Sequence, residues 1–271
     1  MNIQIVSDLH LEFRTNIKEK KKLLIPSAPI LALLGDTCCL GDSYDFNIFC
    51  EFIEEILPLF QKIIIITGNH EYYYNGKKNG ITSEITINEI DKKLKKYCKI
   101  TSPKLHFLNN NVLKIKSGKN KYAIIGSTLW SNIPPDQQST IQNSMNDYSY
   151  IYVQEGKKIR RLLASDITAK FWKNYKYIDN KINKLSKLNY KIIVFTHHKP
   201  YVKSGFNPKS ADVAYMSDCS NLFKKSVVLW AYGHTHIKDN TTVNFTKLYS
   251  NPKGYPGEKT EFNPSAVIKL N

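Results

Sequence analysis

Length, composition and charge set the first limits on this chain of 271 residues. Its hydrophobic content of 42% is enough to bury one substantial core, which predicts a single domain over residues 1–271. No apolar stretch approaches the ~20 residues that cross a bilayer, which argues against a membrane-spanning protein. An expected strand begins almost at the first residue, so we expect no signal peptide.

The formal net charge of +16 raises the question of a nucleic-acid partner, because clustered cations release counterions from phosphate backbones. However, 36 of the 39 cationic side chains are lysines, and arginine is the residue that binds phosphate in bidentate fashion. We therefore expect a lysine-coated exterior, with the run Lys18–Lys22 solvated, and do not favour nucleic acid as the partner. Five cysteines without a CxxC pair fit a reducing, cytoplasmic location.

The first half of the chain alternates buried strands with amphipathic helices. Apolar runs predict strands at Ile3–Ser7, Ile30–Leu34 and from Ile63 onward, the last with four consecutive isoleucines that favour burial on both faces. Apolar residues at helical spacing predict helices over Ser43–Phe60 and near Glu84–Tyr97, with a Gly/Asn/Lys loop before the second helix. This alternation is typical of an α/β fold.

The second half of the chain adds strands that predict a second sheet. Strands are expected near Leu105–Leu108, Val112–Ile115 and Tyr122–Ile125, arranged as hairpins. Residues 131–163 show no clear period and form either an excursion near a site or a surface loop. Ser165 is the expected N-cap of a long helix whose stripe of Ile167, Phe171, Tyr175, Ile178, Ile182 and Leu185 belongs to the core. Strands at Lys191–Phe195 and Val227–Ala231, a short helix around Asn221 and a β-rich tail follow.

Polar residues with metal-binding side chains follow five of these apolar runs. They are Asp8 and His10, then Asp36, then Asn69, His70 and Glu71, then His197 and His198, and finally His234 and His236. In open α/β sheets, ligands bind at the carboxyl ends of strands. A lone histidine at a strand end is usually structural, but five such blocks predict one shared site.

These residue types permit a dinuclear metal centre. Two cations about 3.5–4 Å apart require a bridging anion, and Asp36 is the natural bridge. Asp8 and His10 can serve one cation, while Asn69 offers a neutral oxygen to the other. In the GHTH sequence, the single residue between His234 and His236 lets the two imidazoles address different cations.

The five motifs DLH, GD, GNHE, THH and GHTH resemble those of the calcineurin-like metallophosphoesterase superfamily. The sequences SDLHLEF, TLW, LWAYGHTH, NPKGYPGE and FNP are similar to a branch of small bacterial-type metallophosphoesterases, so the resemblance extends over nearly the whole chain. It implies a four-layer α/β/β/α sandwich with two mixed β-sheets. The dinuclear centre would lie between the carboxyl ends of the two sheets.

The resemblance also implies roles for individual residues. One metal would be held by Asp8, His10, Asp36 and His236, and the other by Asp36, Asn69, His197 and His234, while His70 would be the catalytic histidine that contacts the phosphate and protonates the leaving oxygen. His197 is preferred over His198, which is assigned a structural role. The cofactors are therefore two divalent metal ions, with Mn²⁺ the first choice and Fe, Zn²⁺, Ni²⁺ or Co²⁺ as alternatives.

One position departs from the family pattern. Many relatives carry an aspartate three residues after the bridging one, where it orients the catalytic histidine, and here that position is Cys39. Either Glu71, a water or a backbone carbonyl then orients His70. Cys38 and Cys39 are expected to be buried packing residues rather than redox-sensitive thiols.

The predicted activity is metal-dependent hydrolysis of a phosphoester, with Asp36, Asn69 and His70 as the catalytic set. A small phosphodiester, such as a cyclic or linear nucleotide, is the preferred substrate. The aromatic residues near strand ends could stack a nucleobase, although packing is their more common role; they are Tyr72, Tyr73, Tyr74, Trp130, Tyr148 and Tyr201. The alternatives are a nuclease and a catalytically weak binding scaffold. A protein phosphatase is disfavoured because its GDxVDRG and HGG blocks are missing.

Overall fold

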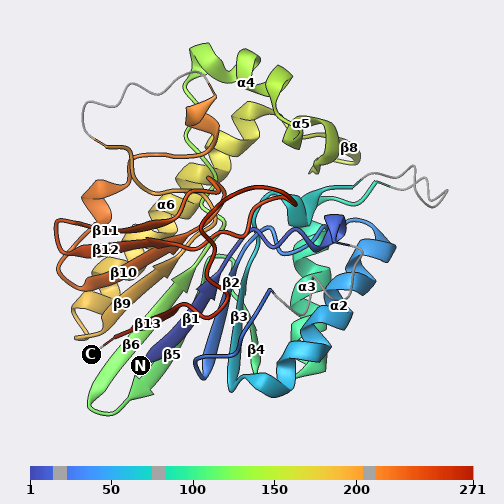
Figure 1. Cartoon of the computed structure of the whole chain (residues 1–271). Helices are drawn as coiled ribbons and strands as arrows, with labels where there is room; N and C mark the ends of the chain where they lie inside the picture. The colour runs from blue at the N-terminus through green and yellow to red at the C-terminus, as the bar shows by residue number, and fades with distance from the viewer. Residues whose placement is uncertain (15–22, 75–83, 204–210, 271) are drawn as a thin grey trace.

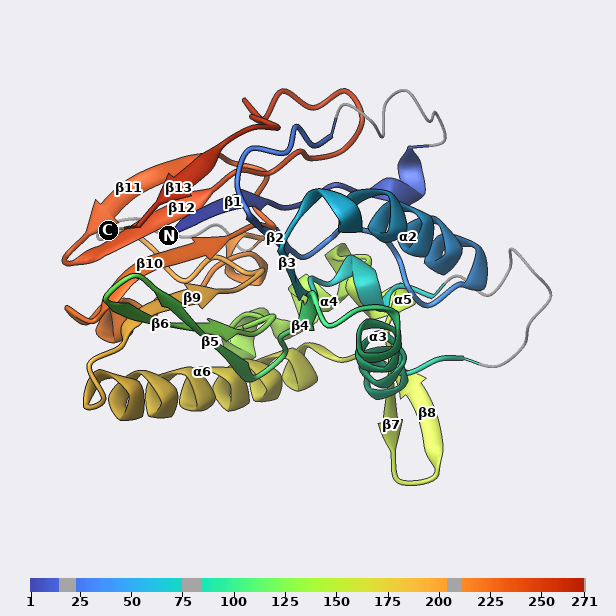
Figure 2. The same cartoon turned by 90° about the horizontal axis from the view of Figure 1, so that it is seen from below.

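Two mixed β-sheets lie face to face and carry helices on their outer sides (Figures 1 and 2). This computed structural model describes residues 1–14, 23–74, 84–203 and 211–270. The arrangement is the four-layer sandwich that the sequence predicted. Two predicted features, the Lys18–Lys22 run and the Gly/Asn/Lys loop after Tyr74, lie outside the described residues.

The first sheet has the strand order β13-β1-β2-β3-β4. Its strands are β1 (Asn2–Val6), β2 (Ile30–Leu34), β3 (Lys62–Ile66), β4 (Leu105–Phe107) and β13 (Val267–Lys269). All neighbours are parallel except β13, which runs antiparallel to β1. The prediction that β4 belongs to the hairpins of a second sheet is wrong, because helix α3 (Ile87–Thr101) returns the chain so that Leu105 pairs with Ile63.

The second sheet has the strand order β11-β12-β10-β9-β6-β5. Its strands are β5 (Asn111–Ser117), β6 (Asn120–Gly126), β9 (Lys191–Phe195), β10 (Val227–Tyr232), β11 (Asp239–Val243) and β12 (Thr246–Ser250). The pairs β5–β6 and β11–β12 are antiparallel, and the central pairs are parallel. The predicted hairpin over Val112–Ile125 is therefore confirmed.

The isoleucines of β3 show why a continuous apolar run is needed here. Ile64 and Ile66 belong to the apolar cluster formed by residues of both sheets, and Ile63 and Ile65 belong to the cluster that includes the helices. Side chains alternate between the two faces of a strand, so both faces of β3 are covered. Burial on both faces is confirmed.

The helices differ from their predicted bounds at specific residues. Helix α2 (Ser43–Ile56) ends earlier than expected and continues as the 3₁₀ turn η2 (Leu57–Leu59), where Pro58 has no N–H to donate. Helix α3 (Ile87–Thr101) starts after a capping box of Thr86 and Glu89. Helix α6 (Ala164–Ser186) is capped at Leu163, not at Ser165, and the side chain of Asp166 accepts the N–H of Leu163 at 2.8 Å.

The irregular region 131–163 forms its own small structures above the sheets. It contains the 3₁₀ turn η4 (Pro135–Gln137), the short helices α4 (Gln138–Ser144) and α5 (Asp147–Tyr150), and a hairpin of β7 (Tyr152–Glu155) with β8 (Lys158–Arg161). Further 3₁₀ turns are η1 (Leu11–Phe13), η3 (His70–Tyr72), η5 (Asp212–Ala214) and η6 (Ser220–Leu222). Among the described residues, every helix is too short or too polar to cross a membrane.

Candidate dinuclear metal centre

Strand ends from both sheets deliver the predicted polar residues to one place. Asp8 and His10 follow β1, Asp36 follows β2, and Asn69 and His70 follow β3 in the first sheet. In the second sheet, His197 follows β9, and His234 and His236 follow β10. The sequence placed these residues at strand ends, and the distances below show that they meet.

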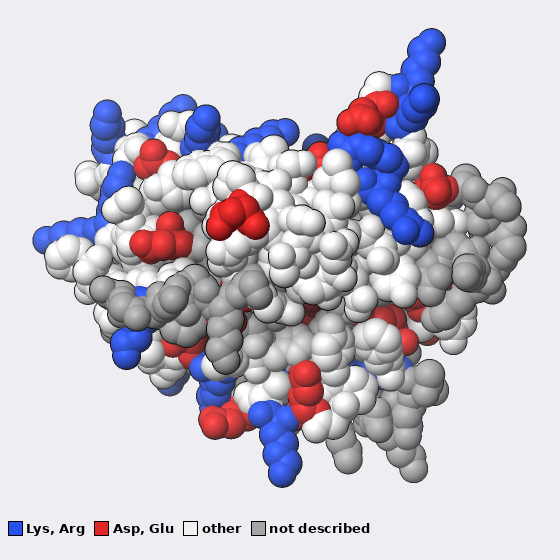
Figure 3. Space-filling model, turned by 90° about the horizontal axis from the view of Figure 1, so that it is seen from above, with Lys and Arg blue, Asp and Glu red and all other residues white. Residues whose placement is uncertain are grey.

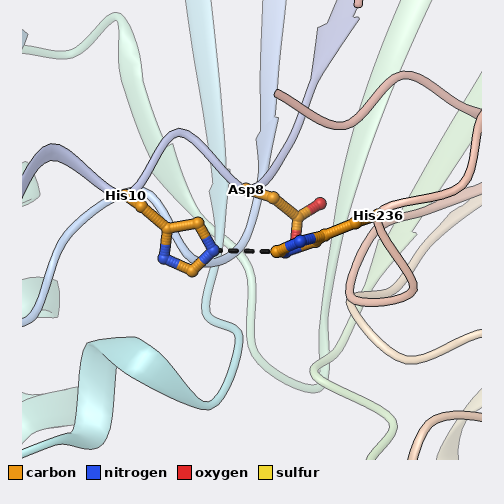
Figure 4. A group of neighbouring side chains, drawn as sticks. All are labelled: Asp8, His10 and His236. Atoms are coloured by element: carbon orange, nitrogen blue, oxygen red, sulfur yellow. Dashed lines mark hydrogen bonds and ion pairs between the residues drawn. The ribbon is translucent and has the colours of Figure 1, made fainter. Parts of the chain in front are cut away.

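Asp8, His10 and His236 form one group (Figure 4). The Nε2 atoms of His10 and His236 are 3.3 Å apart, and His236 Nε2 lies 3.5 Å from Asp8 Oδ1. Asp8 also accepts the backbone N–H of His234 at 2.9 Å, and Glu258 lies 2.6 Å from His236 Nδ1. The carboxylate on Nδ1 fixes the imidazole so that Nε2 faces Asp8 and His10.

Asp36, His197 and His234 form a second group, which Asn69 joins. His197 Nε2 is 3.2 Å from Asp36 Oδ2 and 3.2 Å from Asn69 Oδ1. The same Asp36 oxygen lies 4.0 Å from His10 Nε2 of the first group. Asp36 is therefore the carboxylate between the two groups, in the position that a bridge requires.

His197 and His198 have different surroundings. His197 Nδ1 donates to the carbonyl of Leu34 at 2.8 Å, which directs Nε2 to Asp36. His198 instead lies 3.3 Å from the carbonyl of Thr128. Burial and the neighbouring His197 lower the pKa of His198 to about 3. The geometry thus brings His197, and not His198, to the carboxylate.

The backbone at these positions adopts a conformation that residues with a side chain rarely use. Asp8, His10, Asp36, His234 and His236 all have positive φ, between 47° and 65°. Each such residue costs of order 1–3 kcal/mol, and strain of this kind clusters at functional sites. The strain at five of the predicted ligands is therefore evidence for a functional site, and this evidence is independent of the sequence motifs.

The donor set fits metal ions. His234 Nε2 is buried without a hydrogen-bond partner among the described residues, although a buried imidazole nitrogen normally has one. The neighbouring donors are nitrogen and oxygen atoms, and the buried Asp8 and Asp36 supply negative charge. Burial raises the pKa of Asp36, but the charges on His197 and His70 outweigh it and hold the pKa well below its usual value. Both carboxylates can therefore pair with a metal cation or with a protonated histidine.

Asp147 shows that the irregular region contributes to the centre. Its Oδ1 accepts hydrogen bonds from Asn69 Nδ2 at 2.8 Å and from Tyr73 Oη at 2.6 Å. With Nδ2 held in this way, Asn69 Oδ1 faces His197. Of the two interpretations of residues 131–163, an excursion near the site is therefore correct at Asp147. No sequence pattern indicated this aspartate, because it does not follow a strand.

Glu12 contacts the histidine that the sequence assigned to catalysis. Its Oε1 lies 3.0 Å from His70 Nδ1 and 3.2 Å from His10 Nδ1. Burial opposes ionisation of both groups, but hydrogen bonds with His10 and His70 lower the pKa of Glu12 to about 2. The charge of Asp36, together with Glu12, raises the pKa of His70 to about 9. Glu71, a predicted partner of His70, instead accepts the backbone N–H groups of Asp36, Thr37 and Gly68.

Two pockets open beside the centre. One, of about 370 Å³, is lined by Asp36, Asn69, His70, His234 and His236 among others. The other, of about 430 Å³, shares His70, Tyr73 and Tyr255 with the first and also has aromatic side chains at Phe13 and Tyr150. Of the aromatic residues that the sequence proposed, Tyr73 lines both pockets, and Tyr72, Tyr74, Trp130 and Tyr148 are buried in packing.

Comparisons with known proteins agree with this geometry. A family model described as calcineurin-like phosphoesterase matches residues 1–238. The uncharacterized protein L509 of Acanthamoeba polyphaga mimivirus is 31% identical, over 99% of this chain and 96% of its own. The phosphopantetheinyl hydrolase of Mycobacterium tuberculosis has a similar fold, with a TM-score of 0.69, 14% identity and coverage of 94% and 90%. A dimetal phosphatase from Danio rerio matches at a TM-score of 0.50, 10% identity and coverage of 96% and 90%.

Proposed function

The chain belongs to the calcineurin-like phosphoesterase family, and we propose that it is a phosphodiesterase that uses two metal ions to hydrolyse a small, nucleotide-like substrate. The observation that carries the proposal is the position of Asp36, which lies between two groups of nitrogen and oxygen donors from different sheets. The family is metal-dependent, and the strained backbone of five of these residues supports the same site.

We assign one metal to Asp8, His10, Asp36 and His236, and the other to Asp36, Asn69, His197 and His234. When bound, two divalent cations supply Lewis-acid stabilisation of negative charge on the phosphate and acidify a water. Mn²⁺ is the first choice for such nitrogen and oxygen donors, with Fe, Zn²⁺, Ni²⁺ and Co²⁺ as alternatives. Elemental analysis of protein purified without chelator measures the identity and stoichiometry.

The protein's own groups set the rest of the chemistry. His70 lines both pockets, and Glu12 holds its Nδ1, so its Nε2 is directed to the side where substrate enters. With Nδ1 held by Glu12, the imidazole can supply a proton or hydrogen bond toward the leaving oxygen through Nε2. Asp147 holds the Nδ2 of Asn69, which leaves the Oδ1 of Asn69 to bind a cation.

The pair of pockets supports a substrate with a phosphate and a flat organic group. The smaller pocket lies over the histidines and Asp36, where a phosphate would meet the cations. The larger pocket has aromatic side chains from Phe13, Tyr73, Tyr150 and Tyr255, on which a nucleobase can stack. A panel of cyclic nucleotides, nucleotide monoesters, dinucleotides and single-stranded oligomers with Mn²⁺ identifies the preferred class.

The test of the proposal uses an activated aryl phosphodiester and purified, metal-loaded protein. Asp36→Asn removes the charge between the two donor groups and is expected to abolish turnover. For a diester with an alkyl leaving group, which needs a proton, His70→Ala is expected to lower turnover by about 10²–10⁴-fold, the range of general acid catalysis. Circular dichroism checks that both variants fold. Rates equal to the wild type in either folded variant would contradict the assignment.

A nuclease is the second candidate, and the net charge of +16 favours it. Lys and Arg side chains stand as separate projections on the face seen in Figure 3, where uncharged surface lies between them. Activity on DNA or RNA that falls steeply between 50 and 200 mM salt would establish this alternative. No turnover across the whole panel would instead favour a binding scaffold.

We place the enzyme in the cytoplasm on the basis of its cysteines. All five are thiols, Cys38, Cys39, Cys98 and Cys219 are buried, and no described pair forms a disulfide. Burial raises the pKa of Cys39 well above its usual value and that of Cys98 to about 12, which keeps both thiols protonated and unreactive. Cys38 belongs to the apolar core, whereas Cys39 is buried but also lines the larger pocket.

A further inference from the structure

The sequence NPKGYPGE, residues 251–258, brings a tyrosine to the centre from outside the part of the chain that matches the family model. The hydroxyl of Tyr255 lies 3.0 Å from Nε2 of His70. Its ring centroid is 4.3 Å from that of His10 and 4.9 Å from that of His236. Tyr255 also lines both pockets.

The loop holds Tyr255 through backbone contacts. Glu258 accepts the N–H of Tyr255 at 2.9 Å with the same oxygen that contacts His236 Nδ1. Gly254 has φ of +71°, and a Cβ there would collide with Glu258. Arg14 donates to the carbonyl of Gly254 at 2.6 Å. The phenol is therefore placed by the same contacts that orient His236.

Glu12, His70 and Tyr255 form a continuous chain of hydrogen bonds. A carboxylate can only accept, so His70 Nδ1 donates to Glu12 and Nε2 faces the phenol. When His70 is protonated on both nitrogens, Nε2–H donates to Tyr255 Oη, and the phenolic hydrogen is left to donate elsewhere. In this arrangement Glu12 orients the imidazole of His70, and the imidazole in turn exchanges a proton with Tyr255.

The exposed fractions of His70 and Tyr255 show which end of this hydrogen-bonded series meets the substrate. His70 is 6% exposed, whereas Tyr255 is 37% exposed. A phosphoester that enters the pockets therefore meets the hydroxyl of Tyr255 at the position where His70 Nε2 would otherwise point.

We propose that Tyr255 is a catalytic residue whose hydroxyl donates its proton to the leaving oxygen, with His70 behind it and Glu12 as the positioning residue. The inference rests on the proposed function. The bond from phosphorus to the leaving oxygen breaks as the bond to the oxygen of water forms. The leaving oxygen takes the phenolic proton, His70 returns a proton to Tyr255, and the water supplies one to His70. The products are an alcohol and a phosphate monoester.

The test compares two diesters that share one half and differ in the leaving alcohol. One leaves as p-nitrophenolate, which needs little protonation, and the other as a simple alkyl alcohol, which needs a proton. Tyr255→Phe is expected to lower kcat for the alkyl ester by about 10²–10³-fold and for the nitrophenyl ester by less than about fivefold. KM for both esters and Mn²⁺ binding by calorimetry are expected to stay within about threefold.

Two further variants sharpen the comparison. Glu12→Gln keeps the size of the side chain but weakens the hold on His70, and it is expected to lower the ratio of alkyl to nitrophenyl turnover about tenfold. Tyr44→Phe removes a hydroxyl from an exposed tyrosine on α2 and is expected to leave that ratio unchanged.

The outcomes separate the two proposals. Suppose that the wild-type protein turns over both esters and that Tyr255→Phe lowers both rates equally or lowers neither. This result overturns the role of Tyr255 and leaves the proposed function standing. A wild-type protein that turns over neither ester contradicts the proposed function, and the role of Tyr255 with it.

Discussion

Asp147 tests whether a residue outside the donor groups controls them. It holds Asn69 Nδ2 at 2.8 Å and is itself buried, so its loss would free the Asn69 amide to rotate. Groups that orient a metal ligand typically change metal affinity or activity by 10–100-fold. We expect Asp147→Ala to weaken binding of the second Mn²⁺ by that factor, as measured by titration calorimetry.

Asp136 provides the matched control, because it is an exposed aspartate of the same irregular region. Asp136→Ala is expected to bind two Mn²⁺ with wild-type affinity. If Asp147→Ala also bound both ions as the wild type does, Asn69 would not depend on Asp147, or would not be a ligand.

Site residues at strand ends could be predicted from the sequence, whereas those in other segments could not. Asp8, Asp36, Asn69 and His197 directly follow buried strands, and parallel strand ends meet at one edge, so their types and positions indicate a shared site. Glu12, Asp147 and Tyr255 reach the centre from a 3₁₀ turn, a four-residue helix and a loop, which are too short for a period to relate sequence to direction. Their roles depend on distances across 58 to 185 residues of chain, which only the folded structure provides.

Among the elements, the N-terminus of α6 offers a test of stability that is separate from the metal centre. Asp166 accepts the N–H of Leu163 at 2.8 Å and two hydrogen bonds from Arg160 of β8, at 2.7 and 3.1 Å. Asp166→Asn removes the charge from this partly exposed cluster. We expect it to lower the free energy of unfolding by about 1 kcal/mol at pH 7, measured by thermal unfolding.

The pH dependence of that loss has a definite sign. Burial raises the pKa of Asp166, but Arg160 and the N–H of Leu163 outweigh it, so the pKa lies below its ordinary value of 3.8. The stabilisation is therefore complete above pH 3.8 and is lost as the pH falls through the lowered pKa. The difference between wild type and Asp166→Asn should narrow below pH 3.8. A constant difference down to pH 2 would show that the charge of Asp166 is not responsible.

Elements with strong local patterns matched their predicted bounds, and those set by distant contacts did not. Strands β2 and β9 have the predicted residues, because Pro29 and Gly35 bound the apolar run of β2 and Thr196 ends that of β9. The sheet to which β4 belongs could not be read from its own three residues, since pairing with β3 requires α3 to return the chain. Position within a sheet is a property of the connection and not of the strand.

For the whole molecule, the donor groups connect the two sheets. Asp8, Asp36 and Asn69 come from the first sheet, and His197, His234 and His236 come from the second (Figure 1). A cation held by both sets binds the folded chain and not the unfolded one, because unfolding separates ligands that lie up to 228 residues apart. Metal binding should therefore stabilise the entire fold.

We expect Mn²⁺ at about 100 times its Kd to add about 2.7 kcal/mol to the free energy of unfolding. That gain corresponds to a rise in Tm of roughly 5–10 °C for a chain of this size. Thermal unfolding in excess EDTA and in Mn²⁺ measures the rise in Tm. The Asp136→Ala variant should keep the full rise. His234→Ala removes the imidazole with the buried, unpartnered Nε2 and should lose much of the rise without a large fall in the EDTA value. An equal rise in wild type and His234→Ala would mean that Mn²⁺ binds elsewhere on the folded protein.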